Sequence, residues 1–231
     1  TTVSTPTVTG IVDDTDVAVF ITGSVNPDIG VNYPLGNSTA AWNSGSDIAT
    51  FTRGASGNTS GVSYAVVEFV GNNWKIQRSE KNYSGVTPGT VTTASIAPVG
   101  SLTRAFLHTQ KRMGAGLTTH GDYGHQVYFS GMGQISYVLD TTAGTPASHT
   151  SVAWVFENTQ TIGTTMVVER SNGSQSGGTA PVTLAWNIGR TVGDIQDASI
   201  FINNTGNELG GGGVTNSFPE PMIAARLIST T

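Results

Sequence analysis

An internal repeat constrains this chain more than any other feature of its sequence. Ile48, Ile135 and Ile223 lie 87 and 88 residues apart, and each begins a similar apolar segment. A second apolar segment recurs at a comparable spacing, at 17–21, 103–107 and 198–202. Self-similarity at a fixed spacing is the signature of a structural unit that is repeated along a chain. The sequence therefore predicts repeated units of about ninety residues.

Two further segments match between the first two units only. Residues 62–69 align with 151–158, which places Glu68 against Glu157, and residues 74–78 align with 166–170. A leading segment is common to all three units, at 7–11, 91–96 and 182–186. The third copy ends after its second matched segment, so the sequence contains two units and about half of a third.

The composition predicts that these segments are β-strands. The chain contains 34 threonines and 30 glycines, and it has few of the residues that favour helices. β-Branched side chains fit a pleated sheet, and glycine, asparagine and proline supply the turns between short strands. We expect an all-β fold of tandem antiparallel β-sandwiches, immunoglobulin-like or jelly-roll-like, with about ninety residues in each unit.

The repeat predicts the domain boundaries. We expect a first β-sandwich over residues 1–80, a linker over 81–90, a second sandwich over 91–171 and a linker over 172–180. Residues 181–231 would form a partial third unit, whose apolar residues and strand edges need cover. A longer parent polypeptide, a strand from a neighbouring subunit or packing against the second unit would complete it. Each alternative predicts that the molecule works inside a larger assembly.

Several functional classes are disfavoured by composition. The absence of cysteine rules out disulfides, thiol nucleophiles and thiolate metal sites. Ten Lys and Arg against fifteen Asp and Glu provide no basic surplus for nucleic acid. Apolar runs are far shorter than the roughly 20 residues that span a bilayer. The amino end has neither an initiator Met nor a signal sequence, so we expect a processed or cut chain.

Two carboxylates are expected to have structural partners. In 62–69 both faces of the predicted strand are apolar, which is typical of a central strand covered on both sides. A buried glutamate needs a partner, and the following strand carries an arginine in each unit. We therefore expect Glu68 to lie near Arg78, and Glu157 near Arg170, each pair closing a hairpin. The alternative, a catalytic acid, lacks a second carboxylate nearby in sequence.

Other polar groups have both a functional and a plain interpretation. His120 and His125 flank Asp122 in a glycine-rich stretch, which fits either a metal site or solvent-facing turn residues. The acidic run 13–16 fits a calcium loop or a polar turn, but lacks the spacing of a calcium loop. No nucleophile elbow, phosphate-binding loop or dinucleotide motif is present, so we expect no enzyme activity and no cofactor. Aromatic side chains that could stack on sugars are Trp42, Tyr83, Tyr123 and Tyr128.

The strand at 62–69, followed by 74–78, resembles repeated β-sandwich structural proteins of tailed bacteriophage virions. The segments 48–57 and 223–231 fit the same pattern, whereas 151–158 departs from it. The resemblance covers most of each unit and is a pattern of strands without a catalytic signature. It implies a module of a head, tail or fibre that decorates or attaches, with no enzyme activity.

From the repeat and this resemblance, we expect a non-enzymatic virion structural protein. It would be a capsid decoration or a tail or fibre component, located on the particle surface. Its expected partners are other virion proteins and copies of itself, with a host-surface glycan as a further possible partner. The alternative is a receptor-binding or glycan-binding adhesin module. An enzyme such as a glycosidase would require two carboxylates about 5–10 Å apart in a cleft.

Overall fold

The computed structural model describes residues 2–25, 38–54, 60–87, 89–112, 125–139, 149–161 and 168. The predicted partial third unit, the linker at 172–180 and Arg170 lie outside the described residues. The elements are β1 (Thr2–Ser4), β2 (Val17–Val25), β3 (Ser38–Asn43), β4 (Ile48–Arg53), β5 (Gly61–Glu68), β6 (Trp74–Asn82), β7 (Val91–Ser95), η2 (Leu102–Arg104), β8 (Ala105–Arg112), β9 (His125–Gly131), β10 (Gln134–Leu139) and β11 (Thr150–Asn158).

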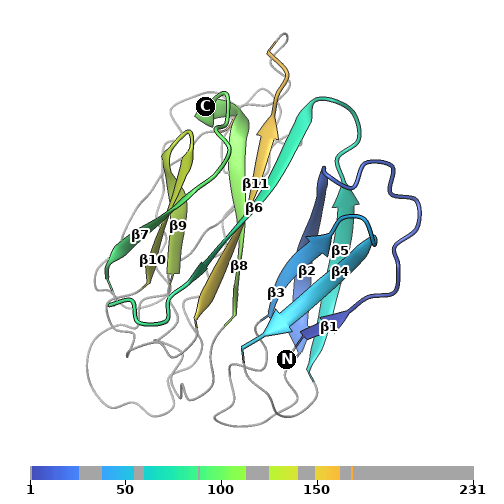
Figure 1. The fold of residues 1–231 in the computed structure, drawn as a ribbon, viewed down its shortest axis with the longest axis horizontal. Coiled ribbons are helices and arrows are strands. Elements are labelled where there is room, and N and C mark those ends of the chain that lie inside the picture. Colours follow the sequence, from blue (N-terminus) through green and yellow to red (C-terminus); the bar gives the residue numbers. More distant parts are fainter. Residues whose placement is uncertain are drawn as a thin grey trace, which may run out of the picture.

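The described part of the chain is all-β, as the composition predicts, and its strands form antiparallel sheets (Figure 1). Two sheets belong to the amino-terminal half, with the orders β1-β4-β3 and β2-β5. Two more follow, with the orders β7-β10-β9 and β6-β11-β8. Within the described ranges, no helix has the length and apolar character that a membrane crossing requires.

Strand β11 lies at the centre of the described part of the chain, and all nine of its residues are buried. Alternate side chains on a strand point to opposite faces, and here both faces are apolar. Ala153 and Val155 pack into a core shared with the sheet β7-β10-β9. Val152, Trp154 and Phe156 pack into a second core, shared with the amino-terminal strands. The sheet β6-β11-β8 therefore lies between the two other parts of the structure, as Figure 1 shows.

The first of these cores lies between two sheets that pack face to face. From the sheet β7-β10-β9 it takes apolar side chains of β9 and β10, including Val127, Ile135 and Leu139. From the opposite sheet it takes Ala105 and Leu107 of β8 together with the inward residues of β11. Burying a side chain of this size contributes about 1.5–3 kcal/mol, so this core is a major source of stability.

The second core joins the amino-terminal half to β11 through aromatic rings. The Phe156 ring stacks on Phe106 and Phe20, with centroid distances of 4.7 and 5.6 Å, and Phe69 packs against it at 5.3 Å. Such pairs contribute about 0.5–1.5 kcal/mol each beyond the area that they bury. Ala18, Val19 and other buried side chains of β2, β3 and β4 complete this core.

A turn with two left-handed residues connects β3 to β4. Gly45 has φ 80° and Asp47 has φ 51°. Glycine adopts this region without a steric cost, and aspartate tolerates it better than most residues. The Gly45 amide donates to the Asp14 carboxylate at 2.7 Å, which ties the turn to the segment that precedes β2.

The hairpin expected from 62–69 and 74–78 does not form. β5 pairs with β2, and β6 instead pairs with β11 over the whole range from Trp74 to Asn82. The physical reason is that β11 has two apolar faces and occupies a sheet centre, which requires a strand at each edge. β5 belongs to a two-stranded sheet and its Tyr64 is 42% exposed, so the expectation of a central strand covered on both sides is wrong there.

Two boundaries also differ from the sequence-based expectation. The leading strand expected at 7–11 lies at Thr2–Ser4, where it pairs with β4. Residues 81 and 82, which were expected to begin a linker, are the last two of β6. Tyr83 follows them and is fully buried in the core next to β10. The buried ring of Tyr83 holds this stretch against the core, whereas the side chains of a linker would be exposed to solvent.

Candidate functional site

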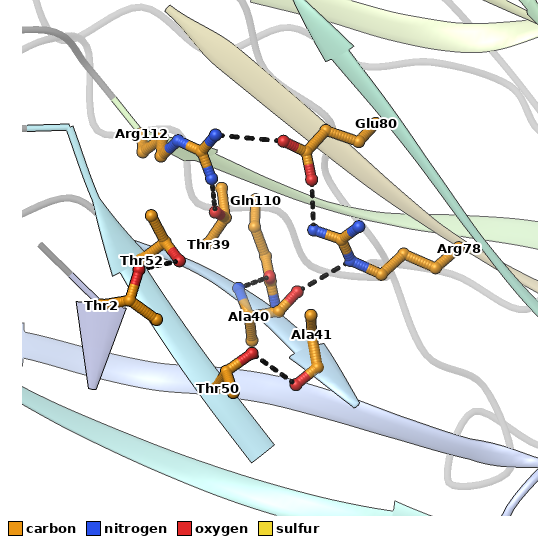
Figure 2. A network of polar contacts seen from close by, with 10 residues as sticks. All are labelled: Thr2, Thr39, Ala40, Ala41, Thr50, Thr52, Arg78, Glu80, Gln110 and Arg112. Carbon is orange, nitrogen blue, oxygen red and sulfur yellow. Dashed lines mark hydrogen bonds and ion pairs between the residues drawn. The ribbon is translucent and has the colours of Figure 1, made fainter. Parts of the chain in front are cut away.

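The described residues contain a polar network where the amino-terminal strands meet the central sheet (Figure 2). Gln110 of β8 is only 6% exposed, and its amide bridges β2 and β3. The Ala40 N–H donates to Gln110 Oε1 at 2.8 Å, and Gln110 Nε2 donates to the Val19 carbonyl at 2.7 Å. A side-chain amide carries one acceptor and one donor group, as a peptide bond does. Gln110 therefore satisfies backbone groups of two strands that have no ladder between them.

Two arginines extend this network toward solvent. Arg78 Nε donates to the Ala40 carbonyl at 2.9 Å, and Arg112 Nη1 donates to the Thr39 hydroxyl at 3.0 Å. Both guanidinium groups also contact the Glu80 carboxylate, at 2.7 Å from Arg78 and 3.1 Å from Arg112 (Figure 2). Arg78 and Glu80 lie on β6, Arg112 lies on β8, and the backbone of β3 lies beside them.

The network fixes β3 against the central sheet. The ion pairs are partly exposed, so each contributes about 0–1 kcal/mol. The buried hydrogen bonds of Gln110 matter more, since an unpaired backbone group in this position would lose about 1–3 kcal/mol. The network therefore positions β3: the two arginines bind a backbone carbonyl and a hydroxyl oxygen of this strand, which belongs to a neighbouring sheet.

Replacing Gln110 by alanine is expected to lower the free energy of unfolding by about 2–4 kcal/mol, because it leaves the Ala40 N–H and the Val19 carbonyl buried without partners. Gln77 is a matched control. Its amide makes the same two bonds, to the Ala97 N–H and carbonyl at 2.8 and 2.9 Å, but close to solvent. Gln77→Ala should cost under about 1 kcal/mol, because water replaces the amide. Equal losses in urea unfolding would contradict this account.

The predicted pair of Glu68 and Arg78 is replaced by other contacts. Glu68 Oε1 accepts hydrogen bonds from the Val12 and Asp13 amides at 2.9 and 2.6 Å, and Arg78 lies against Glu80. The two residues separate because β5 and β6 belong to different sheets. Glu68 instead holds the segment that enters β2.

Glu157 has a comparable role in the second half of the described chain. Its carboxylate is buried and accepts a hydrogen bond from the Gly100 amide, in the segment that leads to η2 and β8. A side chain at position 100 would need room there, since a Cβ would lie 3.2 Å from Glu157 Oε1. The expected partner, Arg170, lies outside the described residues.

His125 is a buried strand residue, although the sequence suggested a loop. It begins β9, and its Nδ1 forms a hydrogen bond with the hydroxyl of buried Ser151. Burial lowers the pKa of His125 to about 3, with smaller contributions from Lys111 and His149. His120, the other histidine of that glycine-rich stretch, lies outside the described residues. Within the described residues, no group of three or more His, Asp or Glu side chains is placed to bind a metal ion.

The acidic run before β2 forms a hydrogen-bonded turn. The Thr15 amide and hydroxyl donate to Asp13 Oδ1 at 3.0 and 2.6 Å, and these bonds lower the pKa of Asp13. Partial burial raises the pKa of Asp16. These contacts are those of a local Asx-type turn, which is the plain interpretation of this run.

The candidate sugar-stacking aromatics occupy different environments. Trp42 lies in β3, packs against the second core and donates from Nε1 to the Asp14 carbonyl at 3.1 Å. Tyr83 is buried, and burial raises its pKa. Tyr128 lies in β9 and is 38% exposed, whereas Tyr123 lies outside the described residues. Of the described members, Tyr128 is the most exposed, whereas Trp42 is only partly exposed.

Nothing in the sequence identified Gln110, Glu80 or Arg112 as site residues. Each lies on a strand, where the alternation of apolar and polar residues predicts only the face of the sheet to which its side chain points. None of the three belongs to a known motif. Comparison with known proteins found no matching family model, no matching curated protein and no matching solved structure. The function must therefore be inferred from the arrangement of strands and from the polar network.

Proposed function

We propose that this chain is a non-enzymatic structural component of a tailed-bacteriophage virion, a capsid decoration or a tail or fibre subunit. It would act through contacts with copies of itself and with other virion proteins. The observation that supports this most is the path of β6. This strand follows β5 in the chain but completes the sheet that contains β11.

We infer that the chain is built from tandem β-sandwich units of about ninety residues. The orders β1-β4-β3 and β7-β10-β9 correspond strand by strand, and β2 pairs with β5 as β8 pairs with β11. Val17 lies opposite Glu68, and Ala105 lies opposite Glu157. This register makes Ala105 the equivalent of Val17 in the second unit. Alignment of the sequence alone pairs Val17 with Thr103, two residues earlier.

In this organisation each unit gives a strand to the next unit. Residues 74–82 then belong to the second sandwich by pairing, although they follow the first in sequence. Stability in such arrays comes from the interfaces between neighbouring units as well as from each unit. A protein built in this way is suited to bearing load or to lining a surface, because neighbouring units cannot separate without breaking a sheet.

The virion proposal predicts that the chain is present in purified particles at a fixed copy number. Quantitative mass spectrometry of gradient-purified virions should find it in a constant ratio to the major capsid protein. Antibodies against it should label one defined part of the particle in electron micrographs. A chain found only in the soluble fraction of the lysate, and absent from particles, would contradict the proposal.

A further inference from the structure

The outer edge of β5 has no partner strand among the described residues. β5 pairs with β2 along one edge only. Its sequence from Gly61 to Val67 contains no charged residue and no proline. Native proteins usually protect an exposed edge with lysine, proline or a bulge, because free N–H and C=O groups bind other strands. The bulge in this sheet lies in β2, between Ile21 and Gly23, and leaves β5 regular.

The corresponding edge of β11 is occupied. β11 has the same relation to β8 as β5 has to β2, and its other edge pairs with all nine residues of β6. β6 is a strand donated by the preceding unit. The outer edge of β5 is therefore equivalent to the edge of β11 that pairs with β6.

The chain carries a second segment of this kind. Residues 166–170 align with 74–78, so Val168 corresponds to Ile76. The backbone amides of Ile76 and Val168 also make similar contacts, each with a residue just before the second strand of its own unit. The Ile76 amide donates to Asp16, just before β2, and the Val168 amide donates to the Thr103 carbonyl, just before β8. The contact of Val168 places it beside η2 of its own chain.

We propose that the outer edge of β5 binds residues 166–170 of a second copy of this chain as an added antiparallel strand. The inference rests on the repeat organisation proposed above, and not on the virion assignment. In β6 and β11, Ile76 lies opposite Phe156 and Gln77 lies opposite Val155. Transferred to the new pair, this register places Val168 opposite Val67 and Glu169 opposite Val66.

This contact joins two different surfaces, the donated segment of one copy and the β5 edge of the next. Such head-to-tail contacts generate rings when the rotation closes, and filaments when it does not. Strand addition takes its affinity from main-chain hydrogen bonds and its specificity from alternate side chains. The proposal therefore predicts a concentration-dependent head-to-tail multimer.

Disulfide cross-linking tests this register cleanly, because the chain contains no cysteine. Val67→Cys and Val168→Cys would be co-expressed on two differently tagged copies and oxidised mildly. Val66→Cys with Glu169→Cys is a second pair, since cross-strand disulfides form at only some positions of a ladder. Met132→Cys with Val168→Cys is the control, because Met132 is 54% exposed and lies in the turn between β9 and β10, away from β5. We expect a covalent dimer that carries both tags from at least one test pair, and none from the control.

Other outcomes would overturn the proposal. These are the absence of dimer from both test pairs, or an intrachain disulfide in the double variant Val67→Cys/Val168→Cys. Light scattering on the unmodified chain should detect multimers, and Glu169→Pro should reduce them to monomer. The Val168 amide donates to Thr103 of its own chain, so the next amide faces the new ladder, and proline cannot donate there. Circular dichroism would verify that the proline variant folds. A purely monomeric unmodified chain would also overturn the proposal. The presence or absence of the protein in virions bears only on the proposed function.

Discussion

Replacing Phe156 by alanine is expected to lower the free energy of unfolding by about 3–5 kcal/mol. Phe156 is fully buried near the carboxyl end of β11, and its ring contacts Phe20, Phe69 and Phe106. These rings come from β2, from the residue that follows β5 and from β8, so the cavity would open where the two halves of the described structure meet. Urea unfolding followed by tryptophan fluorescence would measure the loss.

A matched variant separates this effect from a general sensitivity of the sheets. Tyr128 is an aromatic strand residue that is partly exposed. Tyr128→Ala should therefore cost about 1 kcal/mol or less. A loss below about 1 kcal/mol for Phe156→Ala, or equal losses for both variants, would show that the rings around Phe156 do not join the two halves.

Acidification is expected to destabilise the protein through His125. Its pKa is about 3 in the folded state, against about 6.5 for an exposed histidine. Between these values the unfolded chain binds a proton that the folded chain does not bind, so stability falls as the pH is lowered. This single group contributes about 1.4 kcal/mol per pH unit between about pH 6.5 and pH 3. Its contribution is fully present above pH 6.5.

The comparison that isolates His125 uses His125→Gln, which removes the titrating group. Between pH 4 and pH 6, we expect the stability of the unmodified protein to change more steeply than that of the variant, by about one proton. His108 also has a pKa lowered by burial and acts in the same direction, so it remains in both proteins. Identical slopes for the two proteins would show that His125 takes up its proton in the folded state.

The sequence predicted the strands well where apolar residues alternate or run together. The expected segments 17–21, 48–52, 62–69 and 151–158 all lie within or largely within strands β2, β4, β5 and β11. Alternation reports which side chains share a face, but it says nothing about which strand lies alongside. For this reason the strand at 74–78 was predicted correctly and its partner was not. Its pairing with β11 depends on a strand about eighty residues away in sequence.

The polar site was less predictable than the fold. Glu68 and Glu157 were expected to bind arginines, yet both accept hydrogen bonds from backbone amides. A carboxylate needs donors, but the sequence does not say whether a guanidinium or an amide will supply them. His125 is buried where β9 meets β11, and Gln110 is buried where β8 meets β2 and β3, so the burial of both depends on tertiary packing. Local sequence carries no signal for it.

We propose that this chain is a virion subunit that works by sharing strands with its neighbours. The most direct test is a cryo-electron microscopy reconstruction of intact particles, in which the symmetry environment of the chain is visible. We predict density for the chain at a defined lattice site or along the tail axis, with a strand from an adjacent copy beside β5. Particles without the chain, or copies that touch no neighbour and leave the β5 edge open, would contradict the account.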